Sequence, residues 1–488
     1  MNPLLLLLLI PIAAIAAILW LPQICPKRIT VTAFIVNFVI SLGLFFQFEP
    51  GHGYHWVLKY PWFHLTNVAQ INFHLGVDGI SLMMIFLTTL VSLTAAWVTS
   101  KKVKRAREFF IYVLLISLGA LGAFLSRDLF FIYIFHEFAL IPTFLLIGIW
   151  GGQNRQFASI QMTLYLALGS LILLAGIVGL VLTQPLDSRS FDLEAIQQIH
   201  VIDDGVQKVI YPLLLIGFGI LISIFPFHSW APTGYASAPA AAAMLHAGVL
   251  KKFGLYGLLR LLLPALESGA DYWRPVLLVL IIGNVFYLGY VTMAQKELPL
   301  MLGYSSVMHM GYLFLALASH HLVALTGFVL LMVAHGVSAA LLFALAGEFQ
   351  TKTGETRIAS FGGLYTHAPF LGIMFLIGSM ASIGLPGLAN FSGEVLIFFG
   401  SFKSLPWVTV VCVWGVVISA VYQLRAVRLI CFGTVSEVTA KLVDLSTYSA
   451  RFPYLLLVAV SLWIGINPQS VIHLVQPCIE SILNVGGR

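Results

Sequence analysis

The chain has 488 residues, of which 60% are hydrophobic and only 9% are charged. A soluble domain carries about 25% charged residues, so the composition excludes a soluble globular protein. Backbone groups inside hydrocarbon must be hydrogen-bonded internally, which leaves helices or closed barrels. The apolar runs are about 20 residues or longer and show little alternation, which favours helices. The sequence therefore predicts an all-α, polytopic membrane protein.

We expect no metal, nucleotide or iron–sulfur group in this chain. The four cysteines are scattered and do not have a metal-ligand spacing. No glycine-rich phosphate loop follows a strand pattern. The first apolar run lacks a basic leader and a clear small-residue cleavage site, which predicts a retained first span rather than a signal peptide.

Hydropathy predicts about fourteen spans in chain order. Polar excursions separate some of them, the longest being 48–76 and the acidic segment 185–206. The expected spans are 2–22, 29–47, 78–99, 108–125, 128–150, 158–184, 207–227, 239–263, 275–294, 300–318, 321–347, 363–400, 405–432 and 452–468.

The distribution of basic residues predicts the orientation in the membrane. Of the 25 Lys and Arg residues, fifteen lie in connections after odd-numbered spans and eight in even-numbered connections or at the C-terminal end, with Lys251 and Lys252 inside a span. Cytoplasmic connections carry the excess of positive charge. Both termini are therefore expected on the non-cytoplasmic side, with the cluster 101–107 (KKVKRAR) giving most of the bias.

Two expected spans contain helix-breaking residues. Residues 219–239 include Pro226, Pro232 and Pro239, and residues 381–394 include Gly384 and Pro386. Two interrupted segments in corresponding positions of two halves favour an inverted-repeat transporter with sites near the midplane. Ordinary proline kinks, which are common in membrane helices, are the alternative.

Few ionisable side chains are expected deep in the spans, and a series of them predicts a proton or ion path. Histidine, buried lysine and buried carboxylate can all exchange protons near neutral pH. Three of these residues also have a purely structural interpretation. Glu137 could be a structural carboxylate, Lys252 could snorkel to the membrane surface, and Glu394 could cap the N-terminus of a half-helix. His136 is expected on a different face from Glu137, unpaired. The candidates are Glu137, Lys252, Glu394, His309 and His335, with Lys251, His228 and His246 as secondary or substitute groups.

Several motifs resemble the antiporter-like subunits of respiratory complex I, which are related to Mrp antiporter chains. The resemblance covers about residues 75–432, and the motifs keep their family order. Within that family the chain most resembles the M type, called subunit 4 in mitochondria, because a glutamate stands in NFSGE. The motifs are LGVDGISLMMIFLTTL (75–90), HEFALIPTFLLIGIWG (136–151), FPFHSWAP (225–232), GVLKKFGLYGLLR (248–260), GYSSVMHMGY (303–312), VAHGVSAALLF (333–343) and LPGLANFSGEVLIFFGSF (385–402).

The resemblance implies fourteen helices with two inverted five-helix repeats, each containing a broken helix. Residues 1–107 would hold spans 1–3, 108–263 the first repeat, 264–432 the second, and 433–488 span 14 and the tail. It also implies that Glu137 is the acidic residue of the fifth span and Lys252 the central lysine of the eighth. His309 and His335 would belong to a hydrated axis that ends at Glu394.

The chain departs from the family pattern in the first half. The family pairs the fifth-span glutamate with a lysine five residues before the proline of the FPFH-type motif, where this chain has Leu221. Thr233 also replaces a common aspartate. Glu137 therefore lacks its usual cation, and Lys251, His228 or His246 would have to substitute if the path is intact.

The leading hypothesis is a proton-translocating membrane-arm subunit of NADH–quinone oxidoreductase in a bacterial inner membrane. Its partners would be neighbouring antiporter-like subunits, and flavin, iron–sulfur clusters and quinone would be bound elsewhere in the complex. The alternatives are a subunit of an Mrp-type antiporter or membrane-bound hydrogenase, and a non-pumping structural subunit. The sequence leaves open proton against sodium, the electron donor, the quinone type, the stoichiometry and whether Leu221 disables the first half.

Overall fold

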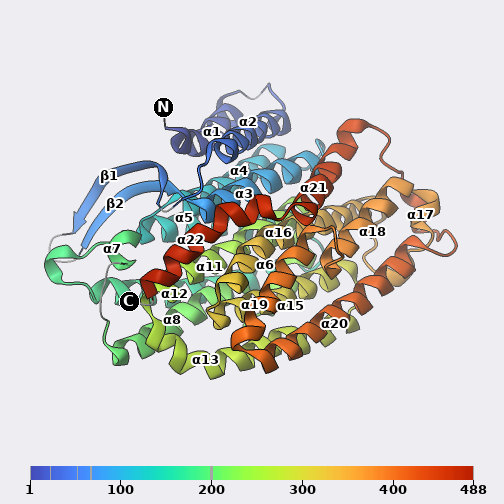
Figure 1. The fold of residues 1–488 in the computed structure, drawn as a ribbon. Coiled ribbons are helices and arrows are strands. Elements are labelled where there is room, and N and C mark those ends of the chain that lie inside the picture. The colour runs from blue at the N-terminus through green and yellow to red at the C-terminus, as the bar shows by residue number, and fades with distance from the viewer. Residues whose placement is uncertain (1, 22, 52, 66–68, 198–201, 487–488) are drawn as a thin grey trace.

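The computed structural model describes residues 2–21, 23–51, 53–65, 69–197 and 202–486. They form a bundle of helices that run alternately in opposite directions, with a small hairpin at one end (Figure 1). Within these residues, twelve helices or continuous helical segments are long and apolar enough to cross a membrane. They are α1 (Pro3–Trp20), α2 (Pro26–Gln47), α3 (Gly79–Val98), α4 (Ala106–Leu125), α5 (Leu129–Trp150), α6 (Arg155–Leu182), α8 (Asp204–Ile222), α13 to α14 (Glu267–Ala294), α15 (Leu298–Ser319), α16 (Leu322–Thr353), α20 (Pro406–Cys431) and α21 (Tyr448–Ile466).

The other two expected spans are also helical, but they are interrupted. The eighth consists of α10 (Ala240–Leu245), η2 (His246–Leu250), α11 (Lys251–Gly257), η3 (Leu258–Leu262) and α12 (Leu263–Ala265). The twelfth consists of α18 (Pro369–Ile383) and α19 (Ala389–Ser404). The prediction of a polytopic helical membrane protein is confirmed, and each expected span corresponds to a helix or a set of helices.

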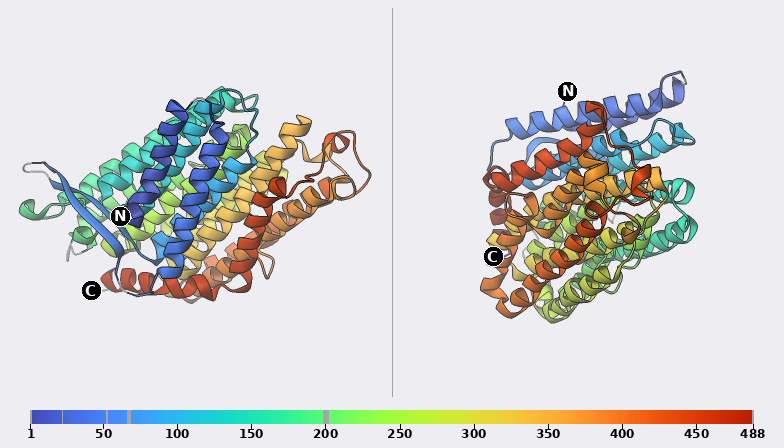
Figure 2. Two further views of the ribbon diagram at one scale, coloured as in Figure 1. Left: turned by 90° about the horizontal axis from the view of Figure 1, so that it is seen from above. Right: turned by 90° about the vertical axis from the view of Figure 1, so that its right-hand side faces the viewer.

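The core of the bundle surrounds α3, α15 and α16. Nearly every residue of these three helices is buried. In contrast, α1 and α2 lie together on one side as an outer layer (Figure 2), and both expose much of their surface. Helices that are apolar on all sides are typical of the centre of a membrane bundle. This arrangement encloses the side chains of α15 and α16 away from lipid.

Both predicted helix breaks occur, and both consist of a left-handed residue followed by a proline. Helix α8 ends at Ser223, which has a φ of +73°, and the chain restarts as α9 (Trp230–Ser237). Helix α18 ends at Gly384, with a φ of +85°, before α19 begins. A left-handed residue ends a helix because it turns the backbone away from the next helical hydrogen bond. Proline follows within three residues in each case, Pro226 and Pro386.

Three short π-helical segments interrupt the eighth and ninth spans. Two of them, η2 and η3, flank α11, and the third, η4 (Gly283–Tyr287), lies between α13 (Glu267–Ile282) and α14 (Leu288–Ala294). A π segment adds a residue to a turn and is often found at functional sites. Each of the three contains a buried polar residue, which is His246, Arg260 or Asn284.

The polar excursion 48–76 contains a β-hairpin, which was not predicted from the sequence. Strands β1 (His55–Leu65) and β2 (Ala69–Val77) are antiparallel, with Tyr60 opposite Phe73. The excursion 185–206 contains the short helix α7 (Leu193–Gln197), which lies beside the hairpin (Figure 1). The remaining short elements are η1 (Leu186–Ser188), η5 (Ile358–Ser360), α17 (Leu364–His367) and η6 (Thr439–Lys441).

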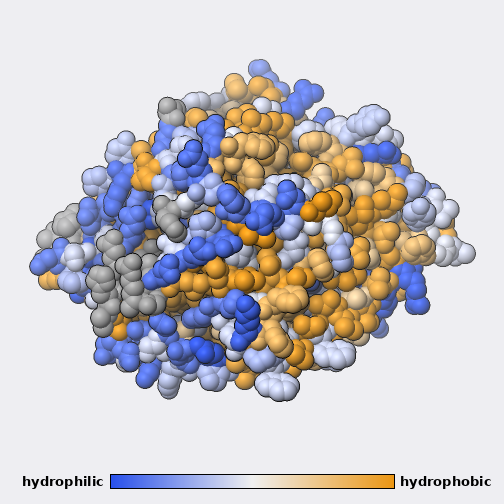
Figure 3. All heavy atoms as spheres, in the orientation of Figure 1, coloured by the Kyte–Doolittle hydropathy of each residue, from blue (hydrophilic) through white to orange (hydrophobic). Residues whose placement is uncertain are grey.

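The outer surface agrees with a membrane location. Hydrophobic residues cover much of the centre and right of Figure 3, and hydrophilic residues gather at the left, where Figure 1 places the hairpin and α7. The last helix, α22 (Gln469–Gly486), packs against α3, α12 and α16. The structure is thus that of a multi-pass membrane protein.

Candidate functional site

A buried lysine and a buried histidine are in direct contact at the centre of the bundle. Lys252 Nζ on α11 lies 3.0 Å from His335 Nδ1 on α16, and it donates to the carbonyl of Ala247 at 2.7 Å. The Lys252 side chain is fully buried, with no exposed surface, which rules out snorkelling. The ammonium donor therefore has an imidazole acceptor within hydrogen-bond distance.

The contacts continue from His335 to a carboxylate. The rings of His335 and His309 have centroids 5.8 Å apart, and His309 Nε2 lies 3.8 Å from Glu394 Oε1. All of these groups are buried. Lys252, His335, His309 and Glu394, which we call the central chain, are therefore successive neighbouring titratable groups from α11 through α16 and α15 to α19.

His309 is held in a setting that suits a protonated ring. Its Nδ1 lies 2.7 Å from the carbonyl of Ser305, and its Nε2 lies 3.0 Å from the carbonyl of Ser382. Carbonyl oxygens only accept hydrogen bonds, so both ring nitrogens must donate for both contacts to form. The neutral imidazole has one ring N–H and can form only one of these two hydrogen bonds, whereas the protonated ring can form both.

The second helix break positions Glu394. A Cβ on Gly384 would collide with Oε2 of Glu394, so the carboxylate packs directly against the backbone of the break. The other oxygen, Oε1, is buried and accepts no hydrogen bond from the described residues. A buried polar atom of this kind is costly unless water or a proton satisfies it. Glu394 thus lies inside the bundle, ten residues after the left-handed turn.

Lys251 lies on another side of the same helix and approaches the first break. Its Nζ donates to Ser306 Oγ at 3.2 Å and lies 5.3 Å from the centre of the Tyr235 ring on α9. The Tyr235 hydroxyl lies 3.3 Å from His246 Nδ1. Lys251 is also fully buried. The secondary candidates Lys251 and His246 therefore surround Tyr235 in the second half of the seventh span.

His228 lies within the turn of the first break. Its ring packs near Phe225, Tyr287 and Tyr304, and its Nδ1 is buried without a hydrogen-bond partner. The turn itself is held by Asn284, which accepts from the amide of Phe225 at 2.7 Å. His228 is therefore close to the break but makes no hydrogen bond to the central chain among the described residues.

Glu137 lies apart from the central chain. Its Oε1 accepts a hydrogen bond from Ser170 on α6, and its side chain is 35% exposed. The expectation that His136 does not pair with it is wrong, because His136 Nδ1 lies 3.6 Å from Glu137 Oε1. Rotation of the two side chains toward each other brings neighbouring helix positions together, despite their 100° offset.

The residues next to Glu137 and Lys252 in the chain are stacked on each other, but Glu137 itself has no polar contact with the lysines among the described residues. The His136 ring stacks on Phe253 at 3.9 Å between centroids, and Phe253 directly follows Lys252 on α11. Among the described residues, no hydrogen bond or ion pair joins Glu137 to either lysine. Leu221, where the resemblance predicts a lysine, is buried and apolar. The five main candidates are thus divided: His335 and His309 lie between Lys252 and Glu394, and Glu137 lies apart from these four.

A buried ion pair beyond the candidate list anchors the far end of the eighth span. Arg260 in η3 donates to Asp78 Oδ1 at 2.5 Å, and both side chains are buried. Asp78 also caps α3 by accepting from the Ser81 amide at 3.0 Å. The sequence signal was present, because Asp78 belongs to the LGVDGISL motif, but nothing in it identified Arg260 as the partner.

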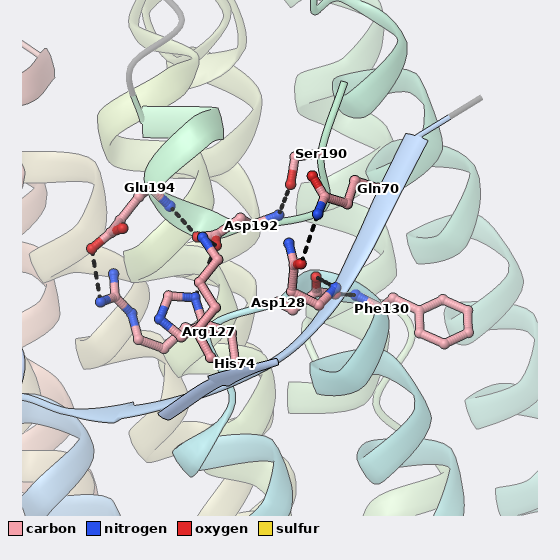
Figure 4. A network of polar contacts seen from close by, with 10 residues as sticks. Gln70, His74, Arg127, Asp128, Phe130, Ser190, Asp192 and Glu194 are labelled. Carbon is pink, nitrogen blue, oxygen red and sulfur yellow. Dashed lines mark hydrogen bonds and ion pairs between the residues drawn. The ribbon is translucent and has the colours of Figure 1, made fainter. Parts of the chain in front are cut away.

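A second polar network ties the hairpin to α5 and α7 (Figure 4). Asp192 Oδ2 lies 2.8 Å from His74 Nδ1 and 2.6 Å from Lys59 Nζ. Burial opposes ionisation of Asp192, but the hydrogen bonds from His74 and Lys59 prevail and hold its pKa well below the usual range. Arg127 donates to Glu194 at 3.0 Å in the same network.

Asp128 in the same network behaves in the opposite way. It accepts from the amides of Asn72 and Phe130 at 2.9 and 3.0 Å. Burial nevertheless raises the pKa of Asp128 to about 6, because these two bonds do not offset the loss of water around the charge. The network therefore holds one firmly ionised carboxylate and one that titrates in a mildly acidic range.

Comparison with known proteins identifies the family. A family profile described as "NADH:quinone oxidoreductase/Mrp antiporter, TM" matches residues 126–419. This chain belongs to that family. The NADH-quinone oxidoreductase subunit M of Rhodobacter capsulatus is 31% identical, and the match covers 94% of this chain and 90% of that protein. The resemblance expected from the sequence is confirmed.

Two further proteins are similar to this chain, one by sequence and one by structure. The F(420)H(2) dehydrogenase subunit M of Methanosarcina mazei is 32% identical, with 85% of each chain covered. A chain in the structure of respiratory complex I from Thermus thermophilus with bound NADH has a TM-score of 0.87 and 28% identity, covering 98% of this chain and 99% of that one. Antiporter-like family members thus share this fold over nearly their whole length.

Proposed function

We propose that the chain is the M-type, proton-translocating subunit of the membrane arm of a bacterial NADH–quinone oxidoreductase. The observation that carries the proposal is the central chain, in which a buried lysine, two buried histidines and a buried glutamate follow one another across four helices. Buried ionisable groups are expensive in a membrane protein and mark ion or proton pathways. The similarity to M subunits supports the choice within the family.

In this proposal protons pass along named atoms. Lys252 Nζ gives a proton to His335 Nδ1, with which it is in direct contact. His309 holds a proton between two carbonyls and the Glu394 carboxylate, and Glu394 releases or receives it at the second break. Water would connect the His335 and His309 rings. A change of charge on one member alters the proton affinity of its neighbour, because charges interact strongly at these distances.

The driving reaction takes place elsewhere in the complex. The chain acts as part of an enzyme, and its own part is to bind and pass protons. Within the described residues no cluster of three or more His, Cys, Asp or Glu side chains could hold a metal ion. We expect flavin, iron–sulfur clusters and quinone to be bound by partner subunits.

Glu137 is proposed to contact a neighbouring membrane-arm subunit. It lies on a face of α5 where Ile134, Phe138 and Ile141 are also exposed. A carboxylate on such a face is costly in lipid, so a second protein chain is the better environment for it. The missing first-half lysine would then be replaced by a group on that neighbour or by Lys251. Both termini are proposed to lie on the non-cytoplasmic side of the inner membrane.

A non-pumping subunit is the competing function, and the isolation of Glu137 favours it. The experiment that separates the two is Lys252→Ala in the intact complex, reconstituted in proteoliposomes, with protons moved per quinone reduced as the readout. We expect a clear fall in this ratio. Lys296→Ala, which removes an exposed lysine, is the control. An unchanged ratio in Lys252→Ala would contradict the proposed path.

A further inference from the structure

A cavity of about 550 Å³ opens between the start of α2, the end of α3 and the start of α21. It lies at the end of the bundle that carries the basic cluster 101–107. Its lining includes three basic residues, Lys27, Arg28 and Lys101. None of the ion pairs found among the described residues involves these three. The cavity therefore has an excess of positive charge without a protein anion to balance it.

Among the described residues, the one carboxylate that lines the cavity is already paired. Glu348 Oε1 on α16 lies 2.8 Å from Lys352 Nζ, one helical turn further along. Lys27 and Lys101 are close enough for their charges to repel each other. Bringing like charges together is unfavourable unless an anion lies between or beside them. The electrostatics of the cavity thus favour an anionic ligand.

Hydrogen-bond donors and a helix end complete the polar part of the cavity. Lys27 Nζ donates to the carbonyls of Trp97 and Thr99 at 2.6 and 2.5 Å, which fixes its position and leaves its third hydrogen free for a ligand. Thr447 lines the cavity and is the N-cap of α21, where the positive end of the helix dipole favours an anion.

An apolar stripe continues from this cavity along the exposed face of α2. Val31 on α2 lines the cavity, and Ile35 and Val39 follow at four-residue intervals on the same side of the helix. Ile35 and Val39 are 38% and 59% exposed. A ligand that fills the cavity and continues along α2 therefore needs an anionic head and a long apolar part.

We infer that this cavity binds the headgroup of an anionic phospholipid, with an acyl chain lying along the Val31–Val39 face of α2. Basic pockets between membrane helices on the positively charged side are suited to phosphate headgroups. A free anion would satisfy the charges but not the apolar stripe. A zwitterionic lipid would fit the stripe but bring its own positive charge into a pocket that already has three.

The test uses the intact complex in nanodiscs that contain a photoreactive phospholipid, followed by mapping of the labelled peptides. Parallel samples carry photoreactive phosphatidylglycerol, photoreactive phosphatidylcholine, or photoreactive phosphatidylglycerol with excess inorganic phosphate. We expect phosphatidylglycerol to label peptides from the start of α2 and the start of α21 more strongly than phosphatidylcholine. Inorganic phosphate should not displace it, because phosphate lacks the apolar contacts.

Charge removal gives the decisive comparison. Arg28→Gln combined with Lys101→Gln should weaken labelling of these peptides by about thirtyfold, since each basic residue near a membrane surface contributes about one kcal/mol to anionic lipid binding. Lys27 is left in place because it also holds the end of α3. Lys104→Gln combined with Lys441→Gln is the control, which removes equal charge from exposed positions outside the cavity.

The inference is overturned by any of four results. These are equal labelling by the two lipids, displacement by inorganic phosphate, labelling unaffected by the double substitution, and no labelling of the cavity peptides at all. The last result would mean that another subunit covers the cavity. Normal assembly and quinone reduction by the double variant confirm that it folds, so a loss of labelling can be assigned to the site.

Discussion

Lys252 Nζ and His335 Nδ1 lie 3.0 Å apart inside the bundle, and neither side chain is open to the surface of the chain. The contact joins the interrupted eighth span to the long continuous helix α16. A lysine in such a position can lose its proton only to a neighbouring group or to internal water. The pair is therefore the best place to test whether the chain moves protons.

Replacement of His335 should break the central chain while leaving Lys252 in place. We expect His335→Ala to lower the protons moved per quinone reduced by at least several-fold, because the histidine is the direct acceptor for Lys252. His473→Ala, in the C-terminal helix, is the control. Proton uptake by proteoliposomes and quinone reduction are measured on the same preparation. Equal ratios in the two variants would remove His335 from the path.

Gly384 should be sensitive for two separable reasons. Alanine there must adopt a left-handed backbone, which costs about 1–2 kcal/mol, and its Cβ also meets Glu394. Gly387 has a similar φ of +92° but nothing within 4 Å of an added Cβ. Gly384→Ala should therefore lower both stability and pumping, whereas Gly387→Ala lowers stability alone. Thermal unfolding and the proton ratio measure the two effects, and matching behaviour of the variants would show that Glu394 packing is unimportant.

The ion pair Asp78–Arg260 should contribute to stability through both partners together. Removal of either leaves a buried charge unpaired, and we expect Asp78→Asn or Arg260→Gln to destabilise the subunit by about 3–5 kcal/mol. The double variant should cost less than the sum of the single ones, because neither charge is left alone. Apparent melting temperatures of the purified complex give the comparison. Strict additivity would mean that the two residues act independently.

The pH dependence of stability should change with Asp128. Its pKa is about 6 in the folded chain and about 4 when unfolded, so the neutral form is favoured by folding. The stability that this provides is complete below about pH 4 and is lost as the pH rises through about 6, by up to about 3 kcal/mol. Asp128→Asn should flatten this change between about pH 5 and pH 7.

Asp192 is the natural control for that measurement. Its folded pKa is below the ordinary value, so its stabilising effect is present above about pH 4 and is lost only in stronger acid. Asp192→Asn should lower the melting temperature both at about pH 5 and at about pH 7, because the Asp192 carboxylate is ionised at both. A pH profile altered by Asp192→Asn but not by Asp128→Asn would contradict the assignment.

Restoring the family's lysine tests the first half of the chain. Leu221→Lys places a cation in α8, where Leu221 is now buried. If Glu137 lacks only its partner, turnover and proton ratio should rise. If no group replaces the missing lysine, Glu137→Gln in the present chain should have a small effect, because no hydrogen bond or ion pair among the described residues links Glu137 to the lysines. A large loss in Glu137→Gln would support the proposed contact with a neighbouring subunit.

The spans and both helix breaks could be predicted because they depend on local sequence. Long apolar runs give the helices, and Pro226 and Pro386 with their neighbouring turns give the interruptions. The candidates His309, His335 and Glu394 were also found as ionisable residues in apolar surroundings. Their arrangement along one axis was implied by the family resemblance alone, because it depends on the packing of α11, α15, α16 and α19 against one another.

Other features escaped prediction for equally physical reasons. The hairpin contains Pro61 and a register irregularity, so its strand pattern is weak within a polar segment. The pairing of His136 with Glu137 depends on side-chain rotation, which helical periodicity does not describe. Arg260 and Asp78 are 182 positions apart in the chain, and only the folded bundle brings them together.

The π segments on either side of α11 have a mechanical consequence. Each contains a wider turn, and consecutive residues of a helix point about 100° apart. Conversion of η2 to ordinary α-helical turns, with no change in chain length, would turn α11 by about that angle relative to α10. Lys251 would then take the direction that Lys252 has now, and Lys252 would turn away from His335. The wide turns thus determine which side of the bundle each lysine side chain faces.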